Sequence, residues 1–149
     1  METIFNLGNK KETISSLERF RNNKYENRMI EIVNAHLKRI NKFYGNNIFS
    51  KNDCFIDSQT LWEIMQPIGF VQHHHSHGLS PEQIFDVLTE MKKPFKVVKS
   101  YDSRYVIITL KTEDNGYNLC VVIKPNTYIE YLDKKINKII TIHPIEIKM

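Results

Sequence analysis

A short stretch near the middle of the chain holds four of its six histidines. His73, His74, His75 and His77 follow one another with only Ser76 between the last two. An imidazole has an unperturbed pKa of about 6.5, so it can accept or donate a proton near neutral pH. This histidine run is therefore a candidate for general acid–base chemistry. In an extended backbone, His75 and His77 would project to the same side.

The same run has two alternative interpretations, a metal site and a plain exposed loop. Neutral imidazole is a good ligand for zinc, copper and nickel. A specific metal site usually takes its ligands from separate elements, and the chain has neither an H-E-x-x-H motif nor a paired cysteine motif. Cys54 and Cys120 are isolated, as is typical of small buried hydrophobes in a reducing compartment. We therefore expect no cofactor and no metal.

The residues before the histidine run have a helical pattern. Apolar residues recur at spacings of three and four within 14–20 and again within 29–44, which predicts two helices. A third helix is predicted over 58–66, with Asp57 or Ser58 as its cap. The N-terminal part of the chain is thus expected to be helical.

The residues after the histidine run contain the clearest helix start. Ser80 stands at the N-cap, Pro81 at the first helical position, and Gln83 completes a capping-box pattern. The helix is predicted to end at 92–93, because Pro94 follows.

Beyond Pro94 the pattern changes to that of β-strands. A single domain is expected over 1–149, because no linker divides the chain. Its helical part is 1–69, and its second part, a helix with an antiparallel sheet, is 70–149. We predict an α+β fold in which N-terminal helices precede a four-stranded antiparallel sheet with the 80–93 helix packed on it. The predicted strands cover 95–100, 104–111, 117–124 and 136–143.

Composition narrows the range of partners. The formal net charge is +4 over 149 residues, which favours polyanions such as nucleic acid, although AT-rich coding also enriches Lys, Asn and Ile. The sequence has no signal-peptide pattern and no run of ~18 apolar residues, so neither secretion nor membrane spanning is expected. A cytoplasmic monomer with no membrane partner is the prediction.

Several short motifs between 73 and 143 together resemble a known nuclease family. They are His77, the L-S-P-E-Q-I start of the helix at 79–84, the hairpin over 105–123 and the final strand over 138–143. The arrangement resembles the phage- and plasmid-associated branch of the barnase/EndoU/colicin/RelE-like nuclease superfamily. That resemblance implies a barnase-like fold, RNA as substrate, and a toxin neutralised by a proteinaceous inhibitor or immunity partner.

Two residues match positions of that family. His77 stands where the family has a histidine before the L-S-P-E helix, and Thr141 where it has Ser or Thr after Ile-Ile in the last strand. The chain departs from the pattern by extending the histidine into a run. It also ends a few residues after Thr141, which leaves open a shortened or inactive site.

Metal-independent RNA cleavage uses the 2′-hydroxyl of the substrate as nucleophile. The protein then supplies a base, an acid and groups that stabilise the phosphorane. Thr141 and His143 would share one face of the last strand. Lys99 or Arg104 could supply positive charge at the RNA phosphate. The candidate catalytic residues are His77, Thr141, His75 and His143.

The sequence thus predicts a metal-independent endoribonuclease, a hydrolase of the toxin type that binds RNA. The alternative is a catalytically inactive phage-type protein that binds and inhibits a host protein or nucleic-acid machinery. The absence of a Glu/Arg/His constellation with recognisable spacing favours the alternative, and the concentration of histidines favours the enzyme.

Overall fold

The computed structural model describes residues 4–44, 47–69, 76–94, 96–99, 105–114 and 116–145. The helices are α1 (Lys10–Asn22), the one-turn α2 (Asn41–Tyr44), α3 (Ser58–Met65) and α4 (Pro81–Glu90), with 3-10 helices η1 (Leu37–Ile40) and η3 (Glu130–Leu132). The strands are β1 (Phe5–Asn6), β2 (Met29–Val33), β3 (Cys54–Asp57), β4 (Lys96–Lys99), β5 (Val106–Asp114), β6 (Tyr117–Ile129) and β7 (Lys134–Ile145).

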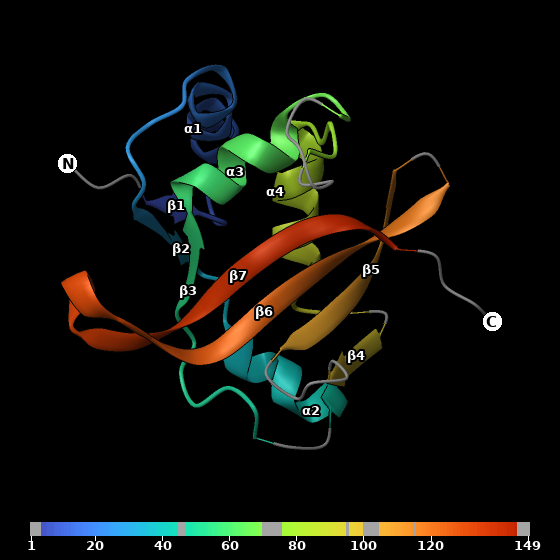
Figure 1. Cartoon of the computed structure of the whole chain (residues 1–149). Coiled ribbons are helices and arrows are strands. Elements are labelled where there is room, and N and C mark those ends of the chain that lie inside the picture. The colour runs from blue at the N-terminus through green and yellow to red at the C-terminus, as the bar shows by residue number, and fades with distance from the viewer. Residues whose placement is uncertain are drawn as a thin grey trace.

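All seven strands belong to one mixed sheet in the order β1-β2-β3-β7-β6-β5-β4 (Figure 1). β1 pairs with β2 in parallel, β3 pairs with β7 in parallel, and the other neighbours are antiparallel. The expectation of a four-stranded antiparallel, barnase-like sheet after a helical N-terminal part is therefore wrong. The fold is α+β, but the N-terminal part contributes three strands to the sheet.

The misassigned segment is 29–33, which was expected to be helical and instead forms β2. Its residues Met29, Ile30 and Ile32 are buried, as in a strand covered on both faces. The chain then turns at Asn34 and His36, which have φ of 68° and 52°. A left-handed backbone conformation ends any regular helix, so the spacing of three and four across 29–44 joins a strand to a separate helical turn.

Local capping signals are realised as expected. The Asp57 side chain accepts a hydrogen bond from the Gln59 backbone N–H and caps α3. Ser80 and Gln83 form a reciprocal capping box at the start of α4, with N–H to oxygen distances of 3.1 and 2.8 Å. Both are N-caps, so they fix where α3, before the histidine run, and α4, after it, begin.

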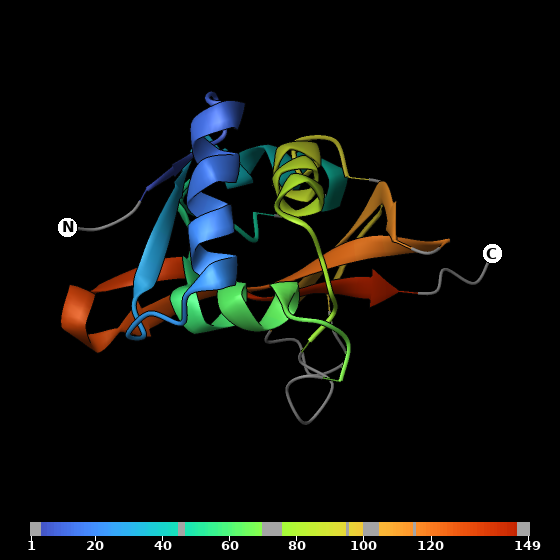
Figure 2. The same ribbon diagram turned by 90° about the horizontal axis from the view of Figure 1, so that it is seen from above.

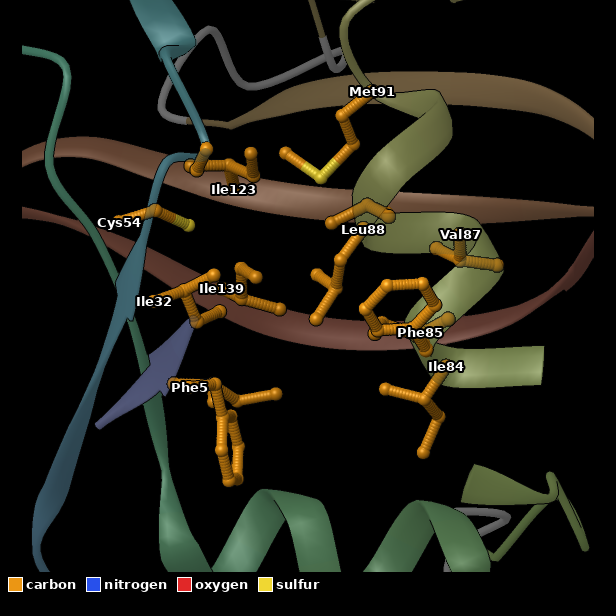
Figure 3. Packing of buried hydrophobic residues seen from close by; sticks show 14 of the residues in the cluster. Phe5, Ile32, Cys54, Ile84, Phe85, Val87, Leu88, Met91, Ile123 and Ile139 are labelled. Atoms are coloured by element: carbon orange, nitrogen blue, oxygen red, sulfur yellow. The ribbon is translucent and has the colours of Figure 1, made fainter. Parts of the chain in front are cut away.

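The helices α1 and α4 lie on the same side of the sheet (Figure 2). The main buried cluster combines α4 residues with residues on one face of β6 and β7, among them Val121, Ile123, Ile139 and Ile142. Leu88 of α4 lies over this part of the sheet (Figure 3). Because side chains alternate along a strand, Cys120, Thr141 and His143 lie on the opposite face.

The Glu90 carboxylate links the C-terminal end of α4 to β5 by hydrogen bonds. The β5–β6 pairing shifts register between Thr109 and Glu113. The Glu90 carboxylate accepts hydrogen bonds there from the backbone N–H of Lys111 and of Thr112, at 3.1 and 3.0 Å. The carboxylate thus satisfies donors at the register shift and holds α4 over the sheet. No helix in the described ranges is long and apolar enough to cross a membrane.

Candidate functional site

The structure brings His77 and His143 together and places Thr141 on the same strand as His143. Thr141 and His143 lie on β7, and His77 lies in the segment that enters α4. His75 and Arg104 fall outside the described residues, as do His73 and His74. Lys99 ends β4, and its side chain is also outside the described part.

The backbone around His77 is anchored on the end of α3. Gly78 donates its N–H to the Gln66 carbonyl at 2.7 Å, and Leu79 donates to the Ile64 carbonyl at 3.1 Å. Gly78 has a φ of 63°, a conformation that a residue with a Cβ adopts only with strain. Leu79 is buried, whereas His77 is half-buried, so the imidazole is held at a surface by a fixed backbone.

His143 is held on β7 opposite Cys120 of β6. The two residues are directly paired, and Cys120 Sγ lies 3.4 Å from His143 Nε2. Thr141 pairs with Val122, so Thr141 and His143 share one face of β7. The register shift of the β6–β7 ladder falls immediately before Thr141, where Ile123 pairs with Ile139. This shift sets which face Thr141 and His143 occupy.

The imidazoles of His77 and His143 meet across the two elements. Their ring centroids are 5.8 Å apart and the planes are inclined by 34°. Burial lowers the pKa of His143 from its ordinary 6.5, so this ring is mainly neutral near pH 7. A neutral imidazole is a proton acceptor. The arrangement can therefore support proton transfer between a ligand and two histidines.

The neighbouring thiol cannot serve as a nucleophile. Cys120 is fully buried, and burial raises its pKa to about 11, so the thiolate is scarce at neutral pH. Cys54 is also buried and free, and burial likewise raises its pKa. Both cysteines are thus small buried side chains, as expected from the sequence.

Lys96 lies on the sheet face that carries His143, although the sequence analysis did not select it as a site residue. The strand register places Lys96, Thr109, Cys120 and His143 in one cross-strand row, whereas Lys99 stands in the row of Val106. Residues directly opposite in a sheet share a face, so Lys96 is on the His143 face and is exposed there. Lys96 and His143 are separated by three strand spacings, about 14 Å. Alternation puts the two lysines on opposite faces of β4, and the register shows that Lys96 is the one on the His143 face.

The described residues form no metal-binding site. No three His, Cys, Asp or Glu side chains among them are grouped to hold one ion. Acid–base chemistry is the use of His77 and His143 that their described geometry supports.

The lowered pKa of His143 has a consequence for stability. In the unfolded chain the imidazole returns to its ordinary pKa of 6.5, so below that pH the unfolded state binds more protons than the folded state. The free energy of unfolding should therefore fall as pH falls from about 7.5 toward the folded pKa. Melting curves of the parent and of His143→Gln, which cannot titrate, should show the weaker acid dependence in the variant. Equal slopes would contradict this assignment.

The chain has no significant match to any protein-family model, to any curated protein or to any solved structure. Its activity must therefore be inferred from the residues around the histidine pair.

Proposed function

We propose that the protein is a metal-independent endoribonuclease that cleaves RNA by activating the 2′-hydroxyl. The observation that carries the proposal is the approach of His77 and His143, with 5.8 Å between their ring centroids. Two imidazoles at this separation can reach the same phosphodiester, one as base and the other as acid. The net charge of +4 favours a polyanionic substrate.

Each of the three residues has one role in the proposed reaction. His143, mainly neutral near pH 7, takes the proton of the 2′-hydroxyl as its oxygen bonds to phosphorus. His77 gives a proton to the 5′-oxygen as the bond from phosphorus to that oxygen breaks, which leaves a 2′,3′-cyclic phosphate. The Thr141 hydroxyl, on the same face of β7, donates a hydrogen bond to a non-bridging oxygen of the phosphorane.

The biological setting follows from the motif resemblance. We infer a phage- or plasmid-associated toxin that acts on cytoplasmic RNA as a monomer and is neutralised by a proteinaceous inhibitor or immunity partner. Two buried free cysteines fit a reducing compartment. These statements rest on the His77, L-S-P-E and Thr141 motifs rather than on the site geometry.

The direct test is cleavage of a labelled oligoribonucleotide by the purified chain in the presence of EDTA. Cleavage with a 2′,3′-cyclic phosphate end is expected. An oligonucleotide of the same sequence with 2′-deoxyribose throughout should stay intact, because it lacks the nucleophile. The double variant His77→Ala/His143→Ala, purified in parallel, controls for contaminating ribonuclease. Cleavage that EDTA abolishes and zinc or manganese restores would refute the metal-independent mechanism.

Lys96 should contribute to RNA binding more than Lys99. A lysine that contacts one phosphate releases about one counterion, which contributes about 0.7 to the slope of log Kd against log salt for a single strand. Lys96→Ala should weaken binding of a 2′-O-methyl oligonucleotide, which cannot be cleaved, and lower that slope. Lys99→Ala is the matched control from the same strand. If both variants bind alike, the assignment of Lys96 to the RNA surface is wrong.

A second function has one observation in its favour. A hollow of about 480 Å³ lies on α1, lined by Lys10, Lys11, Ile14, Ser15 and Glu18, and shares no residue with the histidine site. An inactive protein that binds and inhibits a host protein would need a surface apart from the histidine site, and this one combines charged side chains with the half-buried Ile14. Lack of RNA cleavage by the parent chain would make this alternative the preferred function.

A further inference from the structure

The Cys120 side chain contacts Nε2 of the His143 ring. Its Sγ lies 3.4 Å from Nε2, and the two residues are directly opposite on β6 and β7. Cys120 has no exposed surface, so its position is set by the packing of the sheet. The sulfur therefore has a fixed position relative to the imidazole.

The contact is between two neutral groups. Burial is the larger influence on the thiol and raises its pKa to about 11, while a hydrogen bond from the His143 backbone acts in the opposite direction. A thiolate–imidazolium pair is thus excluded near neutral pH. A neutral thiol is a weak donor through S–H and a weak acceptor through sulfur, and a neutral imidazole carries its proton on one nitrogen only. The nitrogen that holds the proton is determined by the hydrogen bond it makes.

We propose that Cys120 is a positioning residue that accepts a hydrogen bond from Nε2–H of His143. This bond fixes the tautomer in which Nδ1 carries the lone pair, and it holds the ring toward His77. The inference rests on the proposed function, in which His143 is the base and Nδ1 is the atom that receives the 2′-hydroxyl proton. Cys120 acts only through His143 and does not touch the RNA.

Two described groups that contact the His143 ring are consistent with this role. Cys120 approaches from β6, and the His77 ring approaches from the segment before α4. With Nε2 directed at sulfur, Nδ1 is the only ring nitrogen left to exchange a proton with a ligand. Loss of the sulfur would let the ring take either tautomer and turn within its site.

The test compares Cys120→Val, Cys120→Ala and Cys120→Ser with the control Cys54→Val. Val and Ala lack a hydrogen-bonding atom, whereas Ser retains one. Ala covers the case in which the branched side chain of Val prevents folding. We expect Val and Ala to lower kcat by roughly 10- to 100-fold, the range for loss of a group that orients a functional imidazole, with KM little changed. Ser should restore most of kcat. Cys54→Val, which removes the other buried thiol, should leave kcat at the parent value.

The ¹⁵N chemical shifts of the His143 ring provide a second readout that does not depend on cleavage. In the parent they should show the Nε2–H tautomer, and in Cys120→Val and Cys120→Ala a mixture. Parent-like shifts and parent-like kcat in both variants would overturn the proposal. If the parent does not cleave RNA but the variants change the tautomer, the ribonuclease function fails while the positioning of His143 by Cys120 stands.

Discussion

Replacement of His77 by alanine is expected to slow RNA cleavage by ~10²–10⁴-fold, the usual range for loss of one general acid or base. The ring lies 5.8 Å from that of His143 and is the group assigned to protonate the leaving 5′-oxygen. His77 is only half-buried, so the melting temperature should change little. Single-turnover cleavage of an oligoribonucleotide and a thermal melt measure the two quantities.

The matched control is His36→Asn, because His36 lies before η1 and is assigned no part in the reaction. Its φ of 52° is tolerated by asparagine, so the substitution avoids the strain that alanine would add. His36→Asn should cleave like the parent. If His77→Ala also cleaves like the parent, His77 is not the acid, and the binding-protein alternative becomes the better explanation of the chain.

A substrate with a good leaving group separates the role of acid from a purely structural role. An oligoribonucleotide whose 5′-oxygen is replaced by sulfur at the cleaved bond needs little protonation of the departing atom. His77→Ala should therefore lose much less rate on this substrate than on the ordinary one. His143→Ala should be equally slow on both, because the 2′-hydroxyl still has to lose its proton.

The local parts of the fold could be predicted from the sequence. The capping box of Ser80 and Gln83 and the cap at Asp57 each depend on residues within three positions of one another. Such signals do not require knowledge of the tertiary structure. The start of α4, a few residues after His77, was therefore predictable, whereas the hydrogen bonds from Gly78 and Leu79 to the end of α3 were not.

The N-terminal strands could not be predicted in the same way. β2 is buried because β1 and β3 pair with it, and the three strands are separated in the chain by α1 and by η1 and α2. A short apolar run such as 29–33 fits a strand or a buried helix equally well until its partners are known. The parallel pairing of β3 with β7 joins residues more than 80 positions apart, as in Phe55 with Lys138.

Which side chains meet at the candidate site also depends on long-range strand pairing. The alternation along 141–143 predicted that Thr141 and His143 share a face, because that is a property of any extended strand. The contact of His143 with Cys120, and the choice of Lys96 rather than Lys99, both require the exact pairing of β4, β5, β6 and β7. A shift by one residue would have moved these side chains to the opposite face.

Asn137 is a further residue that only the structure singles out. It lies on β7 with 1% of its surface exposed. Its Nδ2 donates hydrogen bonds to the carbonyls of Lys51 and Asp53, at 3.0 and 2.9 Å, and its Oδ1 accepts one from the Asn126 N–H at 3.3 Å. Asn126 lies where the β6–β7 ladder shifts register between Lys124 and Thr127. One amide thus joins the entry to β3 with the irregular part of the hairpin.

Asn137→Ala should lower the free energy of unfolding by about 3 kcal/mol, because it leaves three backbone groups without their partner at roughly 1 kcal/mol each. For a chain of this size that corresponds to a fall in melting temperature of roughly 6–12 °C. Asn118→Ala is the matched control, since Asn118 makes a single described side-chain bond, 2.8 Å from Nδ2 to the Leu110 carbonyl. It should cost only about 1 kcal/mol. Chemical denaturation of both variants measures the difference. Equal losses would mean that the entry to β3 does not depend on Asn137, and that the parallel pairing of β3 with β7 is sufficient to hold the two halves of the sheet together.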